Sequence, residues 1–135
     1  MKLTARRQAR ELALQILFQT EFAPQISMST FLSVFEHSFD PEVITYADHL
    51  IVGVEKNKAA IDAKIQAASA HWKVERMATI DRNILRIAVF EMKISEEPIK
   101  ENIVINEAVE IAKKYGTTES SSFVNGLLDQ VNKGH

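Results

Sequence analysis

The sequence predicts an all-helical fold. The 135 residues include only four glycines and three prolines, and apolar residues recur mainly at intervals of three and four positions. No stretch sustains the alternation of apolar and polar residues that is typical of a half-buried strand. One hydrophobic core suffices for a chain of this length, so we expect a single domain over residues 1–135.

The first helix is expected from Thr4, which can cap its N-terminus. Its core-facing residues fall within an arc of about 100° when each residue turns the helix by about 100°; they are Ala5, Ala9, Leu12, Ala13 and Ile16. Pro24 and a serine-rich segment separate this helix from a short second one near residues 30–37.

Asp40 and Pro41 provide an N-cap and a first-turn proline for a third helix, which we expect to end near Lys56. A fourth helix should cover residues 59–70. Trp72 is expected to pack where the chain then turns.

A fifth helix can be capped by Thr79, and apolar residues surround most of it, so it should lie at the centre of the fold. Two glutamates and Pro98 follow it. The sixth helix carries an apolar stripe that ends at Tyr115, and Gly116 suits the left-handed conformation that often follows a helix. A last helix should begin within residues 117–122.

The charge distribution is uneven. Four of the sixteen cations and no acid lie in the first ten residues, so the other 125 positions carry twelve cations against eighteen acids, a net charge of −6. The four are Lys2, Arg6, Arg7 and Arg10. This pattern suggests a local site for a polyanion on an otherwise acidic protein, or alternatively a solvated helix end.

The three arginines are predicted to share one flank of the first helix. Relative to Arg6, Arg10 lies at about 40° and Arg7 at about 100°, beside the alanine face. Phe18 lies at about 120° on the same flank. Guanidiniums bind phosphates and an aromatic ring can stack on an unpaired base, so the flank fits single-stranded RNA or DNA. The alternative places Phe18 in the core and leaves the arginines solvated.

No catalytic, metal or cofactor site is predicted. The four histidines, at positions 37, 49, 71 and 135, lack the spacing that would place two imidazoles on one helical face. Glu107 and Glu110 share a face without the histidines of a di-iron site. The chain has no cysteine, no phosphate-binding glycine loop and no recognisable nucleophile with its base.

Glu91 falls on an apolar stripe of the fifth helix, so its carboxylate should need a partner. We expect hydrogen bonds from Asn106, from Asn125, from a cation or from free helix N–H groups. A structural role is favoured over a role as a catalytic acid.

Four segments resemble the bacterial NusB family of antitermination factors: ARRQARELALQILFQ (5–19), IDRNILRIAVFEM (80–92), INEAVEIAKKYG (105–116) and SSFVNGLLD (121–129). Residues 22–75 match poorly. The resemblance implies about seven helices packed as two bundles. It also implies a non-enzymatic RNA-binding adaptor in transcription antitermination on ribosomal RNA operons. Apart from the resemblance, we expect a cytoplasmic protein, because the stretch around Arg6, Arg7 and Arg10 lacks the apolar segment and cleavage site of a secretory signal.

The resemblance also implies partners. They are boxA RNA, the ribosomal protein NusE, the RNA polymerase antitermination complex with other Nus factors, and a possible second copy of the chain. No membrane is expected, because no apolar run in the sequence approaches the roughly 20 residues of a spanning helix. The implied RNA-binding residues are Lys2, Arg6, Arg7, Arg10, Phe18, Glu119, Ser121, Phe123 and Asn125. The implied protein-binding residues are Asp81, Ile84 and Leu85.

Two other functions stay open from the sequence. A NusB-like domain also occurs at the N-terminus of ribosomal RNA cytosine methyltransferases, so the chain could be an accessory domain of such a system. The absence of a cofactor-binding glycine loop and of a cysteine nucleophile argues against activity in this chain. The arginines could instead bind an acidic protein.

Overall fold

A computed structural model describes residues 3–134, and seven α-helices form this part of the chain. They are α1 (Leu3–Phe22), α2 (Met28–Phe35), α3 (Pro41–Lys56), α4 (Lys58–Ala68), α5 (Thr79–Val89), α6 (Glu101–Tyr115) and α7 (Ser120–Gly134). A 3-10 turn, η1 (Val74–Arg76), precedes α5, and a π-helical turn, η2 (Phe90–Ile94), continues it.

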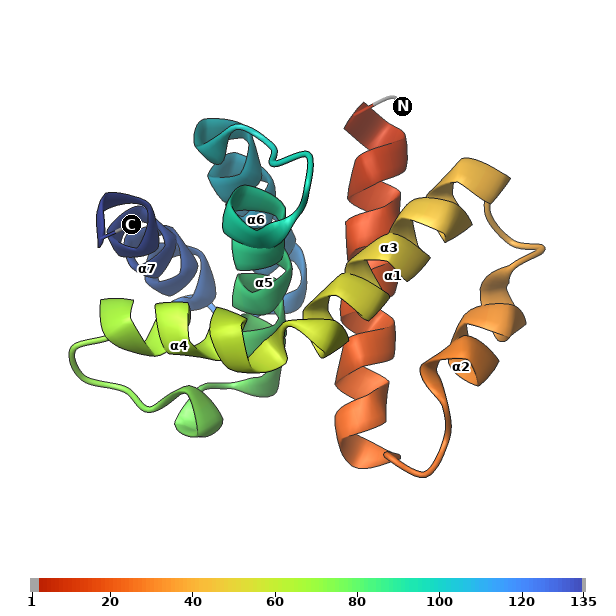
Figure 1. Ribbon diagram of the computed structural model, residues 1–135, viewed down its shortest axis with the longest axis horizontal. Helices are drawn as coiled ribbons and strands as arrows, with labels where there is room; N and C mark the ends of the chain where they lie inside the picture. The colour runs from red at the N-terminus through yellow and green to blue at the C-terminus, as the bar shows by residue number, and fades with distance from the viewer. Residues whose placement is uncertain (1–2, 135) are drawn as a thin grey trace.

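The helices form two groups that meet along α1 and α5 (Figure 1). Helices α1 to α3 pack on one side, and α4 to α7 on the other. Helix α5 contacts α1, α4, α6 and α7, and its Leu85 is 0% exposed. The predictions of an all-helical fold and of a central fifth helix are therefore confirmed.

Several predicted helix ends are close to the observed ones. Helix α3 begins at Pro41 after Asp40 and ends at Lys56, as expected. Thr4, in contrast, lies inside α1 rather than at its cap, because the helix is already formed at Leu3. Trp72 is 58% exposed, so its expected packing is wrong.

Gly116 ends α6 for a different reason from the predicted one. Its φ of −94° and ψ of −165° are extended rather than left-handed. A Cβ at this position would lie 2.3 Å from the Ser120 Oγ and 2.9 Å from the Ala112 carbonyl oxygen. That hydroxyl accepts the Thr117 N–H at 2.9 Å, so glycine permits a tight junction between α6 and α7.

None of the helices within residues 3–134 has the length and apolar character needed to cross a bilayer. The same residues contain no cluster of three or more histidine, aspartate or glutamate side chains placed to hold a metal ion.

Candidate nucleic-acid interface

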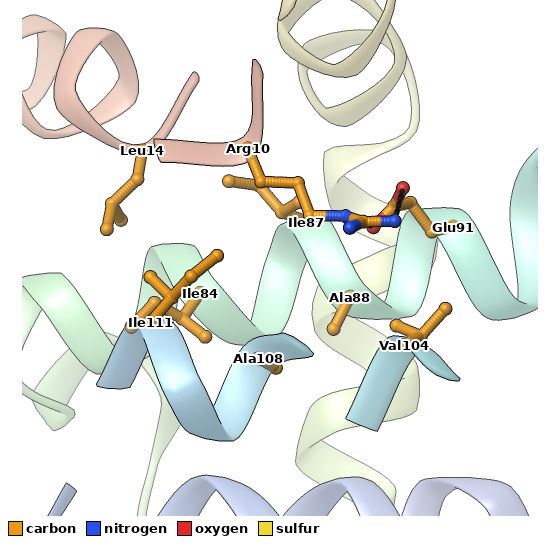
Figure 2. A pocket seen from close by; sticks show the side chains of 9 residues that line it. All are labelled: Arg10, Leu14, Ile84, Ile87, Ala88, Glu91, Val104, Ala108 and Ile111. Carbon is orange, nitrogen blue, oxygen red and sulfur yellow. Dashed lines mark hydrogen bonds and ion pairs between the residues drawn. The ribbon is translucent and has the colours of Figure 1, made fainter. Parts of the chain in front are cut away.

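Helix α1 carries Arg10 into the interior of the protein. Arg10 is 2% exposed, and its guanidinium reaches across to Glu91 (Figure 2). Its Nε donates to Oε1 of Glu91 at 2.8 Å and its Nη2 donates to Oε2 at 3.0 Å. Its Nη1 donates to Oε1 of Glu107 at 3.2 Å. The expectation of three solvent-facing guanidiniums is therefore wrong for Arg10, whereas the expected cationic partner of Glu91 is confirmed.

The buried face of α1 is wider than the alanine face that defined it in the sequence. Leu14 and Leu17 flank the direction of Arg10 on the helix, and they are 3% and 2% exposed. The space beside Arg10 is about 10 Å³, which is room for about one water molecule. Arg10 is thus part of a closed core and has no access to a ligand.

A third group completes the surroundings of Glu91. Tyr46 of α3 donates its hydroxyl to Oε2 of Glu91 in a short hydrogen bond. Burial, followed by the negative charge of Glu91, raises the pKa of Tyr46 above its ordinary value, so the phenol stays a neutral donor. Glu91 lies in η2, and its carbonyl accepts the Ile99 N–H at 2.9 Å. The network therefore ties α1 and α3 to the end of α5.

Arg7 is bound to Glu107 of α6. Its Nε donates to Oε1 at 2.9 Å and its Nη2 donates to Oε2 at 2.5 Å. The side chain of Arg7 is 38% exposed, whereas that of Glu107 is 7% exposed. The hydrogen bonds from Arg7 hold the pKa of Glu107 below its ordinary value. Arg7 is therefore held at the surface by a buried carboxylate.

Arg6 lies on the other side of Arg10, toward α3. It is half-buried, and its Cζ lies 5.1 Å from the centre of the Tyr46 ring. Its Nε has no hydrogen-bond partner among residues 3–134. Arg6 and Arg7 thus turn toward different helices, so the single flank predicted from the sequence is divided.

A groove of about 560 Å³ runs along the exposed side of α1 beside the end of α6, and we call it the α1–α6 groove. Its lining includes Arg7, Gln8, Glu11, Lys114 and Tyr115. Tyr115 is 43% exposed and donates its hydroxyl to Glu11 at 2.7 Å. Lys114 donates to the same carboxylate at 2.9 Å. The groove therefore combines cations, polar groups and an exposed aromatic ring.

A second groove, of about 410 Å³, lies where the start of α5 meets the start of α7, and we call it the α5–α7 groove. Its lining includes Trp72, Arg76, Asp81, Glu119 and Phe123. Asp81 is 9% exposed, and its Oδ1 has no hydrogen-bond partner within the described part of the chain. This groove brings together Glu119 and Phe123, which were predicted to contact RNA, with Asp81, which was predicted to contact a protein.

The model of the NusB family matches residues 7–133. The chain belongs to the NusB family. The transcription antitermination protein NusB of Bdellovibrio bacteriovorus is 80% identical over 135 residues, which are 100% of both chains. NusB of Anaeromyxobacter dehalogenans strain 2CP-1 is 46% identical over 136 residues, covering 98% of this chain and 94% of the relative.

Solved structures of NusB have the same fold as this chain. NusB of T. maritima superposes with a TM-score of 0.87 at 36% identity, covering 96% of this chain and 92% of that one. In a structure of the antitermination factors NusB and NusE in complex with double-stranded RNA, the matching chain superposes with a TM-score of 0.83 at 25% identity. The match covers 99% of this chain and 100% of that one. The predicted NusB-like fold is confirmed, and the family is one of antitermination factors rather than enzymes.

Two of the predicted protein-binding residues are buried in this member of the NusB family. Ile84 and Leu85 are 3% and 0% exposed, because neighbouring helices surround α5. They cannot form a protein-binding surface in this arrangement, and the prediction is wrong for both. Asp81 alone of the three lines a groove.

The remaining predicted RNA-binding residues are spread over α1 and α7. Phe18 is half-buried, and its ring centre lies 4.9 Å from that of Phe22. Ser121 is half-buried and Asn125 is exposed on α7. Lys2 lies outside the described residues.

Sequence reasoning missed Lys114, Tyr115 and Trp72 as candidates in this NusB-family chain. Tyr115 was placed at the end of the apolar stripe of α6 and was therefore not considered as a surface residue, although Gly116 ends the helix directly after it. The paired lysines before it, Lys113 and Lys114, were the available signal for a cationic helix end. Nothing in the sequence around Trp72 distinguishes an exposed ring from a packed one.

Proposed function

We propose that this chain is a non-enzymatic RNA-binding adaptor in transcription antitermination, acting in the cytoplasm. It binds boxA-type RNA of ribosomal RNA operons together with NusE, as part of an RNA polymerase antitermination complex with other Nus factors. The support is family membership, the name of the 80% identical relative, and the similarity to a NusB that was solved with NusE and RNA.

The observation that carries the RNA proposal is the α1–α6 groove. Arg7 enters it as a half-exposed guanidinium, and Tyr115 provides a ring that is 43% exposed. A phosphate bound by a guanidinium and a base stacked on an aromatic ring are the contacts that single-stranded RNA requires. Phe18 lies further along α1. Arg6 turns toward α3 and would contact RNA outside this groove, whereas Arg10 belongs to the core.

The α5–α7 groove would extend the contact surface. Phe123 can stack on a base, while Glu119, Ser121 and Asn125 offer polar groups beside it. Asp81 has a carboxylate oxygen without a donor, which a base amino group or a basic side chain of NusE would satisfy. We assign the protein contact to Asp81.

The experiment for RNA is fluorescence anisotropy with a labelled boxA-like RNA, tested as a single strand and as a duplex. Arg7→Ala should weaken binding about tenfold at physiological salt, because it removes a charge-assisted contact. Lys133→Ala is the matched control, since it removes one exposed cation that pairs with Asp129 on α7, far along that helix from Phe123. Equal affinities for Arg7→Ala and the parent would refute the assigned surface.

The experiment for NusE is a pull-down of the assembly of this chain, NusE and boxA RNA. Asp81→Lys should reduce NusE recovery while Lys133→Ala leaves it unchanged. Sedimentation with and without RNA tests whether a homodimer hides the RNA surface; a dimer that persists with RNA fully bound would contradict that idea.

The methyltransferase alternative has weaker support. The chain covers 100% of the 80% identical relative, whose name is that of an antitermination protein. A methyltransferase domain encoded in frame directly downstream would favour the alternative.

A further inference from the structure

Glu107 joins the buried and the exposed arginines of α1. Its Oε1 accepts hydrogen bonds from Arg7 Nε at 2.9 Å and from Arg10 Nη1 at 3.2 Å. Its Oε2 accepts from Arg7 Nη2 at 2.5 Å. One carboxylate therefore contacts both a core residue and a surface residue.

The core side of this arrangement is fixed. Arg10 is 2% exposed and makes two hydrogen bonds to Glu91, and Glu91 also accepts the hydroxyl of Tyr46. Arg10 thus has one available orientation, and its Nη1 holds Glu107 in turn. The position of the Glu107 carboxylate is set by groups from α1, α3 and η2.

The surface side leaves part of Arg7 free. Its Nε and Nη2 are bound to Glu107, and neither of these two hydrogen bonds, which are those that Arg7 makes within residues 3–134, uses Nη1. A guanidinium is planar and carries five donors, so an anion can bind the Nη1–Nη2 edge while a carboxylate holds the Nε–Nη2 edge. Arg7 lines the α1–α6 groove.

We propose that Glu107 is a positioning residue for RNA binding, which holds Arg7 so that its free Nη edge receives an RNA phosphate while the Arg7–Glu107 pair stays intact. This inference rests on the proposed function. Glu107 itself does not touch the RNA. It acts by fixing in advance a side chain that would otherwise lose several rotatable bonds on binding.

The alternative is that the phosphate replaces Glu107 on Arg7. Glu107 is 7% exposed, and Arg7 provides the donor to its Oε2. Release of Arg7 would leave that oxygen without its hydrogen-bond donor, which is unfavourable although Arg10 still donates to Oε1. Retention of the pair avoids this penalty, so it is the favoured arrangement.

The two arrangements differ in their dependence on salt. If the pair is retained, the negative charge of Glu107 stays beside Arg7 in the complex. Glu107→Gln then does not increase the number of cations that contact phosphate. In the exchange arrangement, Glu107 competes with RNA, so its removal strengthens binding and exposes a full cation, which steepens the salt dependence.

The test is anisotropy with boxA-like RNA over a series of salt concentrations, using the full chain. Glu107→Gln should weaken binding about threefold to tenfold with an unchanged salt slope. Glu110→Gln is the matched control, because this substitution removes the same charge from α6. Glu110 pairs with Lys113 and makes no hydrogen bond to Arg7. We expect its affinity to stay within about twofold of the parent.

A double-mutant cycle separates positioning from general damage to the fold. In an Arg7→Ala background, Glu107→Gln should cause no further loss of affinity. An equal loss in both backgrounds would overturn the proposal in favour of a purely structural role. Tighter binding of Glu107→Gln with a steeper salt slope would overturn it in favour of exchange.

Arg7→Lys keeps the test decisive if Glu107→Gln does not fold. Lysine retains the charge but lacks a second edge, so its ammonium must divide its donors between Glu107 and the phosphate. Binding should weaken about threefold to tenfold at an unchanged salt slope, and parental affinity would refute the inference. If Arg7→Ala itself binds as the parent does, the failure lies in the proposed RNA surface.

Discussion

Arg7 and Arg10 are the same residue type one helical turn apart on α1, and they lie in opposite environments. The side chain of Arg7 is 38% exposed and lines a groove. That of Arg10 is 3% exposed and binds two carboxylates. The neighbouring helices decide which of them can contact a ligand: α6 covers one edge of Arg7, whereas α5, η2 and α6 enclose Arg10.

A cationic stretch of sequence need not form a cationic surface. Arg7, Arg10, Glu91 and Glu107 together carry no net charge, because the two guanidiniums are matched by the two carboxylates. The surface therefore gains less positive potential from its arginines than the sequence suggests. Any RNA affinity must depend on the geometry of a few contacts, with modest dependence on salt.

The largest expected effect is the loss of stability when Arg10, rather than Arg7, is replaced. Arg10→Ala should lower the free energy of unfolding by about 3–5 kcal/mol, because it leaves Glu91 and part of Glu107 buried without a cation. Urea denaturation followed by circular dichroism measures this loss. Arg76→Ala, at an exposed arginine, should change it by less than about 0.5 kcal/mol. A loss below about 1 kcal/mol for Arg10→Ala would show that the network is not a core element.

The next effect tests the far end of the same network. Tyr46→Phe removes one donor from Glu91 and keeps the ring on which Arg6 lies. The free energy of unfolding should fall by about 1–3 kcal/mol, the cost of a buried acceptor that loses a partner. RNA affinity should stay at the parental value. Lower affinity at full stability would mean that Tyr46 belongs to the RNA surface instead.

A smaller effect concerns the exposed groove. Tyr115→Ala should weaken RNA binding by about 1 kcal/mol, the lower end of the range for a base stacked on an aromatic ring. Tyr115→Phe keeps the ring and loses only the hydrogen bond to Glu11, so its affinity should match the parent in anisotropy measurements. Equal losses for both variants would indicate that the hydroxyl, not the ring, makes the contact.

The fold could be predicted from the sequence because it depends on periodicity and helix boundaries. Pro41, Lys56 and Gly116 mark ends that the structure reproduces. The conformation of Gly116 could not be predicted, because it depends on the close approach of Ser120 across the junction between α6 and α7.

The candidate site was predicted in part. The apolar neighbours Leu14 and Leu17 could have indicated that Arg10 points inward, since they share its side of α1. Ile84 and Leu85 were assigned to an exposed side of α5 that does not exist, although the same sequence predicts a central helix. The pairing of Arg7 with Glu107 joins residues 100 positions apart, and no local pattern records such a contact.

The smallest effect tests the Arg7–Glu107 pair by pH. The folded-state pKa of Glu107 lies below its ordinary value, first because Arg7 donates hydrogen bonds to the carboxylate. The pair therefore stabilises the protein above the unfolded-state pKa of a glutamate, about 4.3, and this contribution is lost as the pH falls through the lowered folded-state value. Arg7 is more than one third exposed, so we expect Arg7→Ala to lower the free energy of unfolding by at most about 1 kcal/mol at pH 7. In urea denaturation between pH 7 and pH 3, that difference from the parent should shrink toward zero.

Arg6→Ala removes the same charge from a residue that stacks on Tyr46, and its difference from the parent should stay constant over this range. A pH-independent difference for Arg7→Ala as well would mean that the pair does not hold Glu107 in its ionised form.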